Sequence, residues 1–149
     1  EILDALSLDS SELRRARMMR PVIDTIDFLL DLHSMHERSD PLIIAGPLDK
    51  GVSLGREMGA PATIIRDAGH SDGRRLRDYG DFGDPDSPKN ATLVECGQHW
   101  EASVLSVARD CTARFLRSSG TPSRASRTRV SRDCRIPSCL FGIAAGVSG

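Results

Sequence analysis

The sequence predicts an α/β domain with a mostly parallel mixed sheet flanked by helices. Four short apolar runs cover residues 28–33, 41–46, 62–67 and 91–95, and the first and last of them turn polar at their ends. Near-continuous apolar runs are typical of buried parallel strands. Strands that alternate with helices favour an α/β architecture over an all-β or all-α one.

Each expected helix has a start or stop signal of its own. Ser10 or Ser11 is a candidate N-cap for a helix over 12–20, and Pro21 is expected to mark a break or a fresh start. A second helix is expected over 50–58, where Gly59 terminates it. Apolar residues recur at helical spacing through 99–116, which predicts the last helix.

Two segments carry no such periodicity. Residues 68–90 are rich in Gly, Asp, Ser and Pro and are expected to form long loops. The domain is expected to cover residues 1–117, because Ser, Arg, Gly and Pro dominate residues 118–149, where five Arg and one Asp occur. Such a basic tail is expected to be disordered. A second interpretation is that the natural reading frame or domain was lost near Arg117.

Composition and charge exclude several classes of protein. The formal net charge of the 149 residues is -1, and the body before the basic tail is mildly acidic, which argues against nucleic-acid and membrane-surface partners. No apolar run approaches the roughly 18 residues that a membrane helix needs. The four cysteines show no CxxC spacing, so a reducing, cytoplasmic setting is expected. The oligomeric state is left open.

The first candidate site lies at the end of the run 28–33. Asp31 and His33 share one face of the expected strand, because side chains alternate with a period of two. A carboxylate beside an imidazole is the usual arrangement behind a metal-bound histidine. The alternative is a structural hydrogen-bonded pair without metal.

The second candidate site lies at the end of the run 91–95. Glu95 closes an apolar strand, where a carboxylate is costly to bury unless it is paired or functional, and Gly97 permits a sharp turn beside it. A glutamate near a metal can take a proton from water and return it to a leaving amine. The alternative is a salt bridge between Glu95 and an arginine.

These motifs together resemble the succinylglutamate desuccinylase/aspartoacylase family of zinc-dependent deacylases. Glu-Leu-Arg-Arg-Ala at 12–16, Leu-Asp-Leu-His-Ser at 30–34 and Leu-Val-Glu-Cys-Gly-Gln-His at 93–99 occur in the family's order, within residues 3–116. The resemblance implies a zinc carboxypeptidase-like fold and hydrolysis of N-acyl amino acids or similar small carboxylated amides. It also implies that His33 is a Zn²⁺ ligand and that Glu95 is the general acid/base.

The sequence departs from the family pattern at its beginning. The family's first two zinc ligands come from a His-x-x-Glu segment upstream of the region that starts at Glu1, and no His-x-x-Glu occurs later. The domain is therefore expected to be incomplete at its N-terminus, with one ligand where a catalytic zinc needs three. The alternative function is a catalytically inactive fragment or a binding module that keeps the fold.

Other signals point to substrate binding or to a different chemistry. Arg66, Arg74, Arg75 and Arg77 are expected to hold a substrate carboxylate, although charge clusters of this kind are usually solvated. His70 is expected to line the substrate entrance, with a surface histidine as the alternative. Residues 51–55 match the G-x-S-x-G pattern of serine hydrolases, with Ser53 as the nucleophile. That pattern normally follows a strand directly, so a helix turn is the favoured interpretation.

Overall fold

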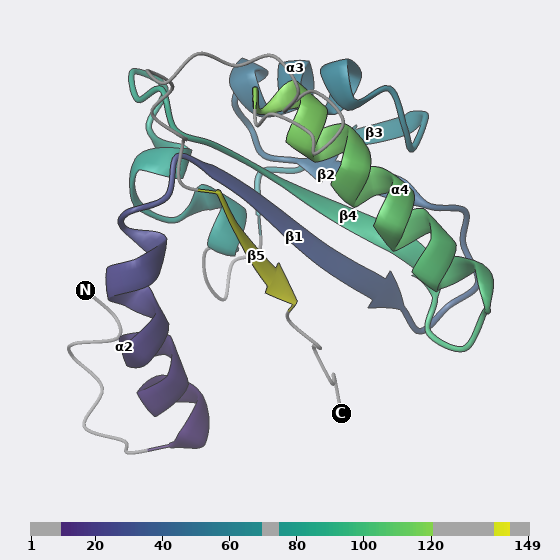
Figure 1. Cartoon of the computed structure of the whole chain (residues 1–149), viewed down its shortest axis with the longest axis horizontal. Helices are drawn as coiled ribbons and strands as arrows, with labels where there is room; N and C mark the ends of the chain where they lie inside the picture. The colour runs from purple at the N-terminus through teal and green to yellow at the C-terminus, as the bar shows by residue number, and fades with distance from the viewer. Residues whose placement is uncertain (1–9, 70–74, 121–138, 144–149) are drawn as a thin grey trace, which may run out of the picture.

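The computed structural model describes residues 10–69, 75–120 and 139–143. Their strands form one five-stranded sheet in the order β3-β2-β4-β1-β5 (Figure 1). The strands are β1 (Phe28–Met35), β2 (Leu42–Ala45), β3 (Thr63–Arg66), β4 (Asn90–Gln98) and β5 (Cys139–Ile143). The predicted α/β class is confirmed.

The pairing of the strands is mixed, as expected. β1 pairs in parallel with both β4 and β5, and β2 pairs in parallel with β3. β2 and β4 are antiparallel. The two longest strands, β1 and β4, are therefore neighbours whose carboxyl ends meet at one edge of the sheet, where α/β proteins commonly place their sites.

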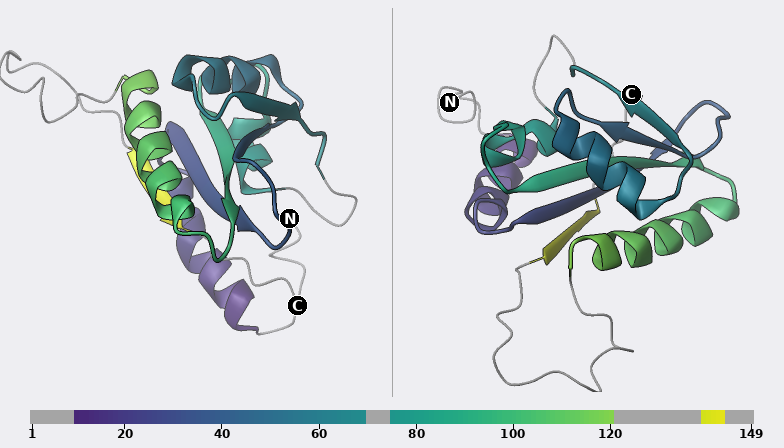
Figure 2. Two further views of the ribbon diagram at one scale, coloured as in Figure 1. Left: turned by 90° about the vertical axis from the view of Figure 1, so that its right-hand side faces the viewer. Right: turned by 90° about the horizontal axis from the view of Figure 1, so that it is seen from above.

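Two helices cover one face of the sheet, which we call the helix face (Figures 1 and 2). Helices α3 (Asp49–Met58) and α4 (Ser103–Ser118) pack there against side chains of the strands. The buried members of this cluster are Leu30, Ile43, Leu54, Met58, Val94, Cys96, Cys111 and Phe115. Because removal of apolar surface from water drives folding, this cluster is the main core.

Glycine explains how closely α3 approaches the sheet. A Cβ atom on Gly55 would lie 3.3 Å from Ile43 Cγ2 and 3.3 Å from Ile64 Cδ1, so a side chain there would push the helix outward. Ser53, between the two glycines of the G-x-S-x-G pattern, is exposed on the opposite side of the helix. The pattern is thus part of a helix that packs through glycine, as the spacing from β2 indicated.

The opposite face of the sheet, which we call the site face, is covered differently. Two short 3-10 helices, η1 (Leu76–Asp78) and η2 (Gly80–Gly83), lie over it within the segment predicted as loops. A second apolar cluster forms at the beginning of the strands, from Ile23, Ile26, Leu29, Phe82 and Ala91. Towards the strand ends this face becomes polar, with Asp31, His33 and Glu95.

The side chain of Lys50 binds the backbone of the loop that follows η2. Lys50 Nζ, at the start of α3, contacts four backbone carbonyl oxygens, those of Asp81, Asp84, Ser87 and Lys89, at 2.5–3.2 Å. Burial lowers the pKa of this ammonium. An ammonium can donate three hydrogen bonds, so the loop backbone supplies more acceptors than the lysine needs.

The first helix is longer than the sequence predicts. Helix α2 runs over Ser11–Ile23, capped by the Ser10 side chain as expected, and Pro21 lies inside it instead of ending it. Proline removes one helix hydrogen bond. The last turn persists because Ile23 and, just beyond it, Ile26 are each 2% exposed in the second apolar cluster.

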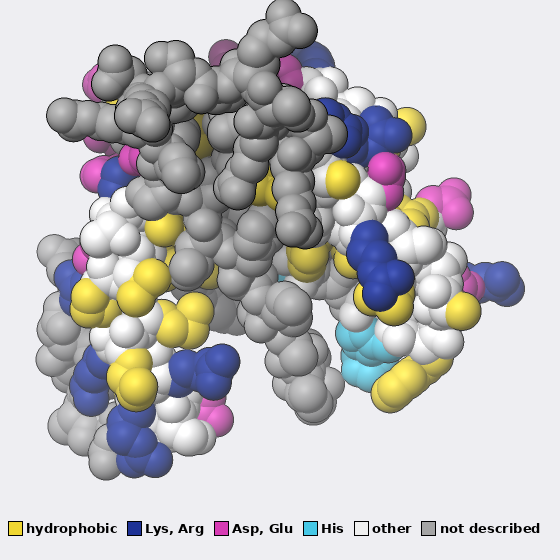
Figure 3. Space-filling view, viewed as in Figure 1, with side chains coloured by type: hydrophobic (Ala, Val, Ile, Leu, Met, Phe, Trp, Pro, Cys, Tyr) yellow, Lys and Arg dark blue, Asp and Glu magenta, His cyan; other side chains and the backbone are white. Residues whose placement is uncertain are grey.

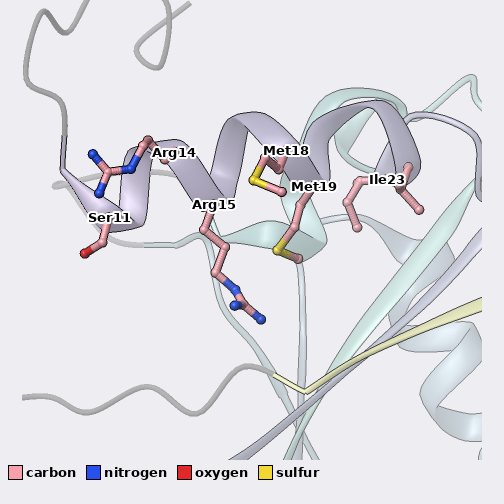
Figure 4. Close-up of a pocket in the computed structure, with 7 residues that line it drawn as sticks. Ser11, Arg14, Arg15, Met18, Met19 and Ile23 are labelled. Carbon is pink, nitrogen blue, oxygen red and sulfur yellow. The ribbon is translucent and has the colours of Figure 1, made fainter.

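Helix α2 extends beyond the edge of the sheet and carries a groove of about 470 Å³ (Figure 4). Met18 and Met19 lie in its middle, between Arg15 and Ile23. The groove lies near the beginning of β1, whereas the predicted site lies at the end of that strand. Within the described ranges, no helix is long and apolar enough to cross a membrane.

Strand β5 lies in the tail that the sequence predicts to be disordered. Residues Cys139–Ile143 pair with residues Phe28–Leu32 of β1 and extend the sheet at that edge. This strand was missed because the surrounding residues are rich in Ser and Arg, whereas the apolar run itself is short. Residues 121–138 and 144–149 lie outside the described residues, so the expected disorder there stays a prediction, as does the domain limit at residue 117.

Candidate functional site

His33 and Glu95 are register partners on neighbouring parallel strands. The pairing of β1 with β4 places His33 opposite Glu95 and Asp31 opposite Leu93. Side chains alternate along each strand, so Asp31, His33 and Glu95 all belong to the site face. The structure therefore brings together the two strand tips that the sequence singled out, although 62 positions separate His33 from Glu95.

Asp31 lies directly behind the His33 ring. His33 Nε2 is 3.0 Å from Asp31 Oδ1, an ion-pair distance without full hydrogen-bond geometry. Asp31 is only 4% exposed. The carboxylate raises the pKa of His33, against the opposing effect of burial. Because Asp31 contacts Nε2, the nitrogen of His33 that remains for a further partner is Nδ1.

Glu95 is a half-buried carboxyl group on the same face. Burial is the main cause that raises the pKa of Glu95, whereas the positive charges of His33 and Arg75 lower it. Its Oε2 atom is buried and has no hydrogen-bond partner among the described residues. The alternative of a salt bridge to an arginine receives no support among the ion pairs of the described residues. A buried acid without a fixed partner is suited to proton transfer.

Two of the predicted substrate-binding arginines have partners within the protein. Arg66 donates to Pro47 O at 2.7 Å and to Asp49 Oδ1 at 2.6 Å at the sheet edge. The Arg77 side chain is fully buried and forms ion pairs with Asp67 at 3.3 Å and with Asp78 at 3.4 Å. His70 and Arg74 lie outside the described residues.

Arg75 is the arginine whose charge acts on the candidate site. It lowers the pKa of both His33 and Glu95, and its Nε atom lies 3.2 Å from Asp67 Oδ2. Its side chain is 24% exposed. The sequence shows Arg75 only as one member of a basic run, and spacing alone does not distinguish it from its neighbours.

The described residues fit a zinc site only in part. Among them, no group of three or more His, Cys, Asp or Glu side chains is arranged to hold a metal ion. His33 is suited to be one metal ligand, and the unpartnered oxygen of Glu95 is suited to proton transfer. A catalytic zinc needs three protein ligands, so these residues do not complete a site.

Comparison of the sequence with models of known protein families gives no match, and neither does comparison with curated protein sequences.

Proposed function

We propose that this chain carries part of the active site of a zinc-dependent deacylase. Its substrates would be N-acyl amino acids or similar small carboxylated amides, and its fold would be zinc carboxypeptidase-like, in the manner of the succinylglutamate desuccinylase/aspartoacylase family. A cytoplasmic location belongs to the same proposal. The observation that carries it is the pairing of His33 with Glu95 on parallel strands, with Asp31 behind the imidazole.

Each residue of the pair has a role that its surroundings support. Because Asp31 lies beside Nε2 and favours a ring proton there, Nδ1 is the nitrogen of His33 that would hold the metal. Glu95 takes a proton from the attacking water and gives it to the departing amine, a role that its raised pKa favours. Zinc, when bound, supplies polarisation of the amide carbonyl. Arg75, Arg74 and His70 remain candidates for the substrate carboxylate, whereas Arg66 and Arg77 are paired with aspartates of the protein.

The proposal requires two further ligands, from a His-x-x-Glu segment upstream of Glu1. In a protein extended to include it, Glu95→Gln should retain zinc but lose turnover by about 100-fold or more, because the amide cannot accept the proton. His33→Ala should lose both metal and activity. Metal analysis and hydrolysis of a panel of N-acyl amino acids measure the two effects. Full activity in Glu95→Gln would remove the proposed general base.

The second candidate function is a binding module or an inactive remnant of such an enzyme. It is supported by the incomplete ligand set among the described residues. One imidazole does not hold zinc against water, so this chain should bind Zn²⁺ weakly and show no chelator-sensitive amide hydrolysis. Tight stoichiometric zinc binding by residues 1–149 would contradict this alternative.

A further inference from the structure

A second chemical pair includes the residue that directly follows His33. Ser34 Oγ is 2.6 Å from His99 Nδ1, and both residues are half-buried. Ser34 belongs to β1, directly after His33, and His99 follows the end of β4. The deacylase proposal uses neither of them. A serine hydroxyl at hydrogen-bond distance from an imidazole is the arrangement that activates a serine nucleophile.

An irregularity in strand pairing brings the two residues together. The register of β1 and β4 shifts after His33, so that Met35 pairs with Gln98, and Gly97 has a φ of +116°. Such a bulge adds a residue to one strand and redirects the side chains that follow it. A φ in this region favours glycine, so the sequence at 97 permits the bend.

The His99 ring is held by its surroundings. The His99 backbone N–H donates to Met35 O at 2.9 Å, which fixes the chain above the end of β1. The His36 ring meets it edge-on with centroids 4.7 Å apart, and the Trp100 ring lies 6.1 Å away. Trp100 is 86% exposed. In the space-filling view, histidine and hydrophobic side chains lie together at this edge of the surface (Figure 3).

We propose that Ser34 and His99 form a nucleophile and general-base pair that reacts with small activated esters without a metal. With the ring proton on Nε2, Ser34 Oγ–H donates to Nδ1, which takes the proton as Oγ attacks the ester carbonyl carbon. The bond to the alcohol breaks, and the alcohol leaves with the proton from His99. Water then attacks the acyl-serine, His99 takes its proton, and the serine hydroxyl is restored as the carboxylic acid departs.

The exposed Trp100 indicates the kind of group that this pair accepts. An aromatic ring at the surface provides apolar contact for an aryl or short acyl group. The substrate class is therefore a small ester with an apolar part, which differs from the charged amides of the proposed deacylase. The two activities also differ in their dependence on metal, so failure of one does not entail failure of the other.

The test is covalent labelling of the chain by a fluorophosphonate probe in the presence of EDTA. Ser34 Oγ bonds to phosphorus, fluoride leaves and the proton passes to His99. Mass spectrometry should locate the label on Ser34, and p-nitrophenyl acetate should be hydrolysed at a rate that EDTA does not change. Ser34→Ala should abolish both signals, and His99→Asn should slow labelling by about 100-fold.

Ser53→Ala is the matched control, because Ser53 is an exposed serine in the G-x-S-x-G pattern. It should label as the unchanged chain does. Circular dichroism verifies that each variant is folded. The proposal would be overturned by a label on Ser53 or by the absence of any label on the folded chain. Equal labelling rates of the unchanged chain and His99→Asn would also overturn it.

Discussion

The two faces of the sheet bury different kinds of side chain. On the helix face, α3 and α4 cover an apolar cluster that extends from Leu30 to Phe115. The site face buries the carboxylate of Asp31 and the side chain of Arg77, which belongs to the 3-10 helix η1, and half-buries Glu95. Both faces belong to the same strands, so the alternation along β1 and β4 alone separates them.

The two faces therefore contribute differently to the stability of the fold and to its chemistry. Burial of apolar groups on the helix face stabilises the fold, whereas burial of ionisable groups on the site face costs free energy unless they are paired. Buried ionisable residues, which are unfavourable in a hydrophobic core, are expected at functional sites. The loss of a buried apolar side chain should therefore always cost stability, whereas the effect of removing a buried polar group should depend on whether that group is paired.

The largest expected effect is on the helix face. Phe115 in α4 has no exposed surface, so Phe115→Ala should lower the free energy of unfolding by about 3–5 kcal/mol through lost burial and a cavity. Urea denaturation followed by circular dichroism measures this. Leu105→Ala in the same helix is the control, because Leu105 is 58% exposed and should change stability by no more than about 0.5 kcal/mol. If the two substitutions lowered the free energy of unfolding equally, α4 would have no distinct buried and exposed sides.

The buried guanidinium on the site face should give the next largest effect. Arg77→Met removes the buried guanidinium that pairs with Asp67 and Asp78, and we expect a loss of about 2–3 kcal/mol, reduced because both carboxylates reach solvent and Asp67 also contacts Arg75. Arg66→Met removes an exposed pair with Asp49 and should change stability little. If Arg77→Met leaves the free energy of unfolding unchanged in chemical denaturation, the charged network contributes no stability.

Thr92 is a buried polar group with no hydrogen-bond partner for its hydroxyl among the described residues. It shares its face of β4 with Val94, so Thr92→Val replaces the hydroxyl by a methyl group within the helix-face core. We expect a gain of about 1 kcal/mol in the free energy of unfolding. Thr63→Val on the exposed edge strand β3 is the matched control and should be close to neutral. Destabilisation by Thr92→Val would mean that the hydroxyl has a partner.

The smallest effect concerns pH. Because burial raises the pKa of Glu95, the folded chain binds this proton more tightly than the unfolded chain does. The resulting stability is present below the unfolded value of 4.5 and is lost as pH rises through the folded pKa. Glu95→Gln should lack this loss, so its stability relative to the unchanged chain should increase between pH 4 and pH 7. Urea denaturation at several pH values measures this. If the free energies of unfolding of the two proteins differ by the same amount at every pH, the raised pKa of Glu95 is contradicted.

The strand tips of the site were accessible to sequence reasoning because they follow local rules. An apolar run that ends in Asp31 and His33, and another that ends in Glu95, are both visible as patterns, and parallel strands align their carboxyl ends. Strand β5 and the persistence of α2 through Pro21 were not accessible in this way. Each depends on a partner elsewhere, the open edge of β1 in one case and the apolar cluster around Ile23 in the other.

The sequence by itself determined the α/β class, the order of helices and strands through residue 118 and the polar ends of β1 and β4, because hydrophobic period and turn residues act over short distances. Only the tertiary structure decided which side chains meet. The register of β1 with β4 sets His33 against Glu95, and the bulge at Gly97 sets Ser34 against His99. Such contacts join residues more than 60 positions apart, and the packing of the strands establishes them, not the local preferences of the chain.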